Sequence, residues 1–172
     1  AAMKAGENFS ENMLLRAIDV AYNLLDERDT ATNEAKKMGT TMTFLMLHEE
    51  GATIAHMGDS RVYQFRPLKN EDRAEILFQT EDHSLVNDLI KIGELTPEDA
   101  KNHPRKNVIT RALQPHLEHR YKADIVTLKD IRPNDFFYMC SDGMLEEASN
   151  ANLCFMLNQQ KPEEELIKML VL

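Results

Sequence analysis

The chain has 172 residues, 42% of them hydrophobic and 28% charged, with a formal net charge of −9 and a pI near 5.1. This length favours a single domain with a real core, and the composition is typical of a globular protein rather than a disordered or membrane protein. Nucleic-acid binding rests mainly on clustered Lys and Arg, so the acidic balance argues against a DNA or RNA partner.

The cysteines favour a reducing compartment, and the apolar runs and chain ends bear on location and completeness. Cys140 and Cys154 lie in apolar stretches, which indicates small buried hydrophobes rather than a disulfide framework or a Cys-rich zinc site. No apolar run approaches the roughly 20 residues of a membrane span, and the first residues lack the apolar region of a signal peptide. We therefore expect a cytoplasmic protein. Both ends read as helix without capping signals, which predicts one partial domain over residues 1–172.

Hydrophobic periodicity predicts a helix followed by a β-hairpin in the first part of the chain. Apolar residues recur at helical spacing over residues 10–26, and Ser10 can cap the start of that helix. Residues 27–37 are polar and are expected to form a loop. Residues 40–47 and 52–57 are rich in β-branched and apolar side chains and flank a short connection that contains glycine, so a hairpin is expected there.

Further strands and a helical insert are predicted for the middle of the chain. Residues 62–65 and 75–79 have strand character, which together with the hairpin predicts an antiparallel, meandering sheet. Residues 84–92 are spaced for a helix, and the Thr-Pro pair at 96–97 begins a second one.

The last part of the chain returns to strands and closes with helices. Residues 121–128 and 135–140 are predicted as strands, and residues 153–157 and 163–172 as helices. Strands grouped with flanking helices, without regular alternation of the two, predict a layered domain of the α+β class.

Two stretches of similar form stand out as candidate sites. In HMGDSR from residue 56 and YMCSDG from residue 138, an apolar strand ends at an aspartate beside glycine or serine. Such an aspartate can present its carboxylate while the backbone turns tightly away, as the oxygen ligands of Mg²⁺ or Mn²⁺ require. The alternative is that Asp59 and Asp142 merely cap ordinary turns.

Other familiar catalytic patterns are absent from the sequence. Neither cysteine is followed by the Arg of a thiolate phosphatase loop, and there is no Gly-rich P-loop, no HExxH and no GxSxG. The six histidines include no pair with zinc spacing on one predicted helix. We interpret His83 and His103 as loop or capping residues rather than as acids or bases.

Five motifs, taken in order, resemble one family. They are MGTTMT from residue 38, HMGDSRVY from residue 56, TEDHSLVNDLIKIGELT from residue 80, HPRKNVITRAL from residue 103 and FYMCSDGML from residue 137. Each is short and unspecific alone, but their order and spacing are hard to obtain by chance. They are similar to the metal-dependent protein Ser/Thr phosphatases of the PP2C (PPM) type, particularly the bacterial members.

This resemblance implies a β-sandwich of two antiparallel sheets flanked by helices, with a metal centre at one end. It implies Mn²⁺ or Mg²⁺ as cofactor, with two or three ions in an intact member. A metal-bound water would attack the phosphorus of phosphoserine or phosphothreonine in line, without a covalent enzyme intermediate. The implied partner is a phosphorylated protein, a substrate in Ser/Thr kinase signalling.

The resemblance also assigns residues. Asp142 matches a core metal aspartate, and Asp59 matches an aspartate of a further, weaker metal site. Glu146 stands where some members place another acidic ligand of that weaker site, usually Asp. Residues 83–105 resemble the mobile flap that influences substrate access in the family. We also expect Arg61 to support the turn at Asp59 through a charged hydrogen bond.

The chain departs from the family pattern near both ends. The early Asp-Gly metal motif, a phosphate-contacting Arg, a catalytic-site His and the late Asp-Asn motif do not occur at the expected places. Because Asp142 is then the one core carboxylate, metal ions are expected to bind weakly and the chain alone to have little or no activity. Two hypotheses follow: a PP2C-type phosphatase, or a catalytically inactive PP2C-like module that binds or regulates a phosphoprotein partner.

Overall fold

The structure is a computed structural model that describes residues 9–31, 38–157 and 164–165. Within these residues the helices are α1 (Glu11–Ala31), α2 (Leu85–Lys91), α3 (Pro97–Ala100), α4 (Asp142–Glu147) and α5 (Asn150–Met156). The strands are β1 (Met42–His48), β2 (Gly51–Met57), β3 (Arg61–Pro67), β4 (Ala74–Gln79), β5 (Asp124–Leu128) and β6 (Phe136–Cys140). None of the described helices combines the length and the apolar character that a membrane span needs.

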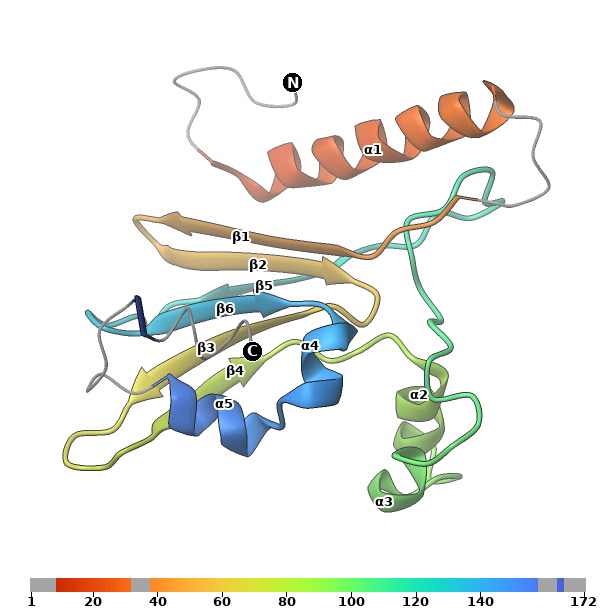
Figure 1. Cartoon of the computed structure of the whole chain (residues 1–172). Helices are drawn as coiled ribbons and strands as arrows, with labels where there is room; N and C mark the ends of the chain where they lie inside the picture. Colours follow the sequence, from red (N-terminus) through yellow and green to blue (C-terminus); the bar gives the residue numbers. More distant parts are fainter. Residues whose placement is uncertain (1–8, 32–37, 158–163, 166–172) are drawn as a thin grey trace.

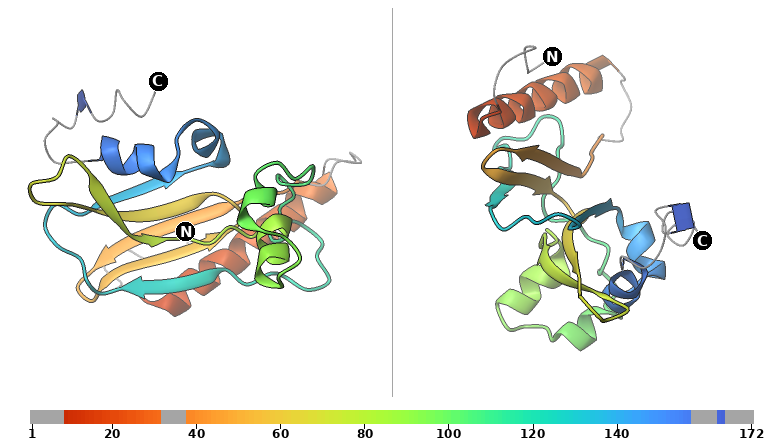
Figure 2. Two further views of the ribbon diagram at one scale, coloured as in Figure 1. Left: turned by 90° about the horizontal axis from the view of Figure 1, so that it is seen from below. Right: turned by 90° about the vertical axis from the view of Figure 1, so that its left-hand side faces the viewer.

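The strands form two antiparallel sheets, ordered β1-β2-β5 and β4-β3-β6. Helix α1 covers the first sheet, and α4 and α5 cover the second, as Figures 1 and 2 show. This confirms the expected α+β sandwich. The expectation of one meandering sheet is wrong, because the chain leaves the first sheet after Met57 and enters the second at Arg61. The crossing is the Gly-Asp-Ser segment at residues 58–60.

The central strands β2 and β3 are buried on both faces, which is why their sequences hardly alternate in polarity. On β2, Ala55 and Met57 pack against α1, whose buried face includes Tyr22. On β3, Tyr63 and Phe65 lie in a second core cluster, with residues of α5. Since strand side chains alternate between faces, the residues between these positions point toward the space between the sheets.

Several elements differ from those predicted. Helix α1 continues to Ala31, so residues 27–31 are helical and not a loop. The prediction was wrong there because a polar, solvent-facing helix end has the same composition as a loop. Helix α4 was not predicted, since its sequence DGMLEE is short and has glycine as its second residue. Strand β5 begins later than expected, at Asp124 rather than at residue 121. The predicted helix over 163–172 falls outside the described residues except for 164 and 165.

The helical insert projects beyond one end of the strands (Figure 1). Ser84 caps α2 by accepting a hydrogen bond from the Asn87 amide, and Thr96 caps α3 in the same way. The stem of the insert is held by two backbone bonds of 2.9 Å, from the Thr110 amide to the His83 carbonyl and from the Leu85 amide to the Val108 carbonyl. The two ends of the insert are therefore fixed beside the sandwich.

Candidate metal centre

The corner that carries Asp59 is built from contacts between distant parts of the chain. Gly58 has φ +107°, a conformation that side chains rarely permit, and a Cβ there would come 2.4 Å from Thr41 Cγ2. The Thr41 and Ser60 hydroxyls share a hydrogen bond of 2.9 Å on the other side of the corner. Asp59 itself is half-buried. Both the backbone conformation and the close packing require glycine at residue 58.

The corner that carries Asp142 is simpler. Strand β6 ends at Cys140, and Ser141 is the N-cap of α4, although its side chain makes no capping hydrogen bond. Asp142 is exposed and is the first residue of the helix. One of its carboxylate oxygens accepts a hydrogen bond of 2.8 Å from the following amide, that of Gly143. This is a local turn contact of the kind that the turn-only alternative described.

Strand register brings the two corners together. Strands β3 and β6 are antiparallel partners, and Arg61 at the start of β3 lies opposite Cys140 at the end of β6. The residues just before Arg61 and just after Cys140 therefore emerge at the same end of the sheet. Asp59 and Asp142 both line one pocket of about 620 Å³.

Glu146 lies on the same pocket wall, one turn further along α4 than Asp142. The three sequence-predicted acidic residues are thus brought together. Burial raises the pKa of the Asp59 carboxyl, and the negative charges of Asp142 and Asp82 raise it further. Among the described residues, Asp59, Asp142 and Glu146 form no ion pair with Lys, Arg or His. A cation would therefore relieve the repulsion between their charges.

This donor set fits a hard divalent cation. The three side chains offer only carboxylate oxygens, which Mg²⁺ and Mn²⁺ prefer over softer donors. Their role as metal ligands remains a prediction. The pocket also receives Asn87 and Lys101 from the helical insert, and Lys106 directly after it. A bound group could thus meet carboxylates on one side and amide or cationic groups on the other.

Arg61 ties the insert to the start of β3. Its guanidinium donates two hydrogen bonds of 2.6 Å to the two carboxylate oxygens of Asp82, and a third to the Tyr63 hydroxyl at 3.0 Å. Burial opposes the charge of Arg61, but the bonds to Asp82 and Tyr63 outweigh it and raise the pKa of the guanidinium. The Asn87 side chain donates to the Asp82 carbonyl at 3.0 Å. The expected charged hydrogen bond of Arg61 thus goes to Asp82, just before the insert, and not to the turn at Asp59.

A second polar cluster near the Asp59 corner was missed in the sequence. His56, His83 and Asp124 offer possible ligand atoms within 4.8 Å of one another. The two imidazole rings are stacked, with centroids 4.6 Å apart and planes inclined by 14°. Ring lone pairs lie in the ring planes, so two nearly parallel rings cannot both direct a nitrogen lone pair at one ion between them. As arranged here, the two rings cannot chelate one ion together, and the cluster connects β2, β5 and the start of the insert.

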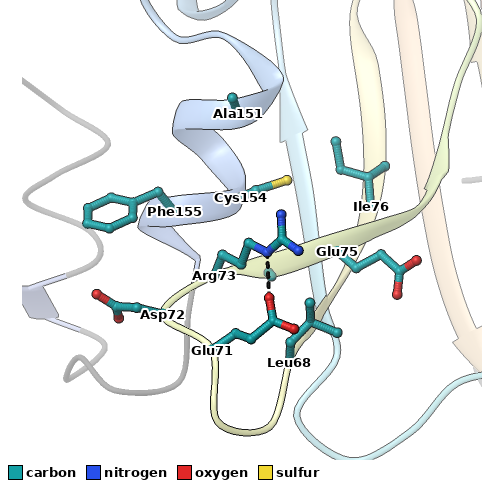
Figure 3. Close-up of a pocket in the computed structure, with 10 residues that line it drawn as sticks. Leu68, Glu71, Asp72, Arg73, Glu75, Ile76, Ala151, Cys154 and Phe155 are labelled. Atoms are coloured by element: carbon teal, nitrogen blue, oxygen red, sulfur yellow. Dashed lines mark hydrogen bonds and ion pairs between the residues drawn. The ribbon is translucent and has the colours of Figure 1, made fainter.

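A larger pocket lies elsewhere. It has a volume of about 980 Å³ between the β3–β4 turn and α5, and Figure 3 shows its lining residues. The Arg73 guanidinium neutralises Glu71 there, at 2.7 Å. Burial raises the pKa of the Cys154 thiol, which disfavours a nucleophilic thiolate. The smaller acidic pocket is the better candidate, because it gathers the three acidic residues that the sequence singled out, Asp59, Asp142 and Glu146.

Comparison with known proteins gives the family. No protein-family model matches the chain. The chain is 35% identical over 128 residues to a Listeria innocua serine/threonine phosphatase named stp, and 33% identical over 140 residues to a Streptococcus pyogenes protein named as a protein phosphatase 2C type. These alignments cover 74% and 78% of this chain but 47% and 51% of the relatives. The chain thus spans about half the length of these relatives.

Solved structures agree with this assignment. The serine/threonine phosphatase of S. agalactiae is 30% identical, with a TM-score of 0.80 over 97% of this chain and 67% of that one. The catalytic domain of the phosphatase PstP, solved with two manganese ions, is 25% identical, with a TM-score of 0.73 over 96% of this chain and 66% of that one. The chain belongs to the PP2C (PPM) family of protein phosphatases.

Proposed function

We propose that the whole protein is a metal-dependent protein Ser/Thr phosphatase that hydrolyses phosphoserine and phosphothreonine. The observation that carries this proposal is the convergence of Asp59, Asp142 and Glu146 on one pocket, where none of the three forms an ion pair with a described Lys, Arg or His. The names of the relatives support catalysis rather than an inactive binding module.

Mn²⁺ or Mg²⁺ is the proposed cofactor, which the two manganese ions in the PstP structure support. When bound, such an ion supplies an activated water and balances the charge of the phosphoryl group. Asp142 and Asp59 would hold the cation from two adjacent strand ends, and Glu146 would add a third carboxylate from α4. The half-buried position of Asp59 strengthens its attraction for a cation, because fewer waters screen its charge.

The helical insert over residues 83–105 is proposed to act as the flap beside this site. Lys101 of the insert and Lys106, which follows it directly, line the pocket and carry charge of the sign that attracts phosphate. The Arg61–Asp82 pair fixes the stem of the insert, so movement would be concentrated in α2, α3 and the turn after them. The partner is then a phosphorylated protein in Ser/Thr kinase signalling, and the proposed location is the cytoplasm.

The decisive test uses the full-length protein. We expect hydrolysis of p-nitrophenyl phosphate and of a phosphothreonine peptide that depends on Mn²⁺ and stops with EDTA. Asp142→Asn is expected to lower the turnover by more than about 100-fold, since changes to groups that only support a metal ligand already cost roughly 10- to 100-fold. Glu118→Gln removes an exposed carboxylate from a distant loop and serves as the matched control. Undiminished turnover of the Asp142→Asn variant would refute the assignment.

The 172-residue chain alone is expected to have little or no activity, because it carries only part of the family's metal motifs. Under identical conditions it should hydrolyse p-nitrophenyl phosphate far more slowly than the full-length protein. Equal rates of the two proteins would show that the carboxylates described here suffice for catalysis.

A further inference from the structure

His83 holds both peptide groups that flank Gly58. The Gly58 amide donates to Nδ1 of the His83 ring at 3.1 Å, and the His83 backbone amide donates to the Gly58 carbonyl at 2.9 Å. His83 lies in the insert stem and is only 4% exposed, so water does not compete for these bonds. The glycine that precedes Asp59 is thus fixed by one residue from a distant part of the chain.

The bonds to Gly58 and Asp124 set the tautomer of the His83 ring. A backbone N–H can only donate, so Nδ1 must carry a lone pair, and the proton of the neutral ring is on Nε2. That proton is donated to the Asp124 carboxylate at 3.1 Å. The approach of Arg111 Nη1 to Nε2 at 3.4 Å is then a contact between two donors and no hydrogen bond. The His56 ring stacks on one face of His83, and His56 Nε2 donates to the Glu81 carbonyl at 2.8 Å. The ring therefore has one orientation with its lone pair toward Gly58.

The Asp59 corner needs such support. Gly58 has no side chain and occupies positive φ, so it would be the most flexible link between β2 and β3 if it were released. Asp59 is half-buried near two other carboxylates, whose charges repel its own. A released corner would let Asp59 swing toward water and away from Asp142. The bond between Thr41 and Ser60 restrains the corner after Asp59 but does not reach Gly58.

We propose that His83 is a positioning residue, which directs Asp59 into the acidic pocket by holding the two peptide groups around Gly58. The inference rests on the proposed function, since it assigns His83 to the same metal centre. His83 touches neither substrate nor metal in this role. Asp124 and His56 fix the ring, and the ring fixes the corner.

Two substitutions of His83 test the hydrogen bonds of the two ring nitrogens separately. In His83→Asn, the side-chain oxygen can occupy the place of Nδ1 and accept the Gly58 amide, while the contact with Asp124 is lost. In His83→Gln, the longer side chain can reach Asp124 but leaves the Gly58 amide without its acceptor. Both variants lose the stacking on His56, so they differ only in which ring contact is kept, the one to Gly58 or the one to Asp124. His103→Gln is the matched control, because His103 Nδ1 accepts the Arg105 amide at 3.1 Å in an exposed turn of the insert.

The first readout does not depend on metal. Amide hydrogen exchange of Gly58, followed by NMR on the nitrogen-15-labelled chain, should become about five- to tenfold faster in His83→Gln, as the loss of an ordinary hydrogen bond produces. In His83→Asn and in His103→Gln it should stay within about twofold of the unsubstituted chain. Equal exchange rates in the asparagine and glutamine variants would overturn the proposal.

The second readout is Mn²⁺ affinity, measured from the electron paramagnetic resonance signal of free Mn²⁺. The His83→Gln variant should bind Mn²⁺ about five- to tenfold more weakly, and His83→Asn should restore the affinity. Faster Gly58 exchange with unchanged Mn²⁺ affinity would show a purely structural role and overturn the positioning role. Should the glutamine variant not fold, the asparagine variant decides, since it must keep Gly58 protected.

Failure of the proposed function gives a different result. If the unsubstituted chain bound no Mn²⁺ at millimolar concentration, the metal centre itself would be in error. The order of the Gly58 exchange rates would still decide whether His83 holds the corner.

Discussion

The two aspartate corners share a sequence pattern but are held in very different ways. The Asp59 corner is fixed on one side by His83 and on the other by Thr41, both distant in sequence. The Asp142 corner is exposed, and the Asp142 carboxylate accepts a hydrogen bond from the amide of the next residue. One half of the candidate metal centre is therefore preorganised by the tertiary fold, whereas the other is positioned mainly by the register of β6.

This difference has a physical consequence for a cation site. A fixed carboxylate loses little conformational freedom on binding, whereas an exposed one must be ordered by the ion. Substitutions at the Asp59 corner should accordingly affect stability strongly, and those at the Asp142 corner should affect it little. The following predictions test this contrast.

The largest effect is expected for Gly58→Ala. The new Cβ would lie 2.4 Å from Thr41 Cγ2, and alanine is strained at φ +107°, so the free energy of unfolding should fall by about 3 kcal/mol or more. Urea denaturation measures this. Gly93→Ala is the control, because Gly93 has φ +78° but no atom within 4 Å of its Cβ position, and its cost should be only about 1 kcal/mol. Equal costs would mean that the Asp59 corner is not tightly packed.

A smaller loss is expected for Asp82→Asn. The substitution removes a carboxylate from Arg61, whose side chain is 24% exposed, and should destabilise the chain by roughly 2 kcal/mol. Glu98→Gln breaks an exposed pair with Lys101 in the same insert and should cost less than about 0.5 kcal/mol. Similar denaturation midpoints for the two variants would contradict a structural role for the Arg61–Asp82 pair.

Thr41→Val should have a still smaller effect. Valine keeps the shape of threonine but removes the hydroxyl that bonds to Ser60, so a loss of about 1 kcal/mol is expected. Thermal unfolding of the variant would detect it. If stability did not change, the side of the corner that follows Asp59 would be held by packing alone.

The smallest effect, with the opposite sign, is expected at the other corner. Gly143 lies in α4, and a Cβ there would meet only Ser141 Oγ, at 4.0 Å. Gly143→Ala should therefore stabilise the chain by about 0.5 to 1 kcal/mol, because alanine is the better helix former. Destabilisation by more than 1 kcal/mol would indicate that the Asp142 corner is as constrained as the Asp59 corner.

Much of the fold could be predicted because its signals are local. The glycine-containing connection after His48 identified the first hairpin, and Thr96 with Pro97 identified the start of α3. Helix α5 was confirmed where apolar spacing placed it. The change of sheet at residues 58–60 could not be predicted from spacing alone, because a strand pattern does not specify which strand is its neighbour.

The residues of the site also fall into two groups, those predicted from local sequence and those placed by tertiary contacts. Asp59 and Asp142 were found because each follows a strand and adjoins a glycine, a pattern visible within a few residues. The convergence of Glu146 with them depended on the family resemblance. His83, Asp82 and Asp124 acquire their roles only through contacts across the fold. No local sequence pattern distinguishes a buried histidine that bonds a distant backbone amide from a loop histidine.

The most direct test of the shared metal centre is paramagnetic broadening of the nitrogen-15-labelled chain by Mn²⁺. If the two corners bind one cation site, the amide signals of Asp59 and Asp142 should broaden together at the same low Mn²⁺ concentration, with Glu146 close behind. Broadening that affects the two aspartates at clearly different concentrations, or that is centred on Asp124 instead, would contradict the account.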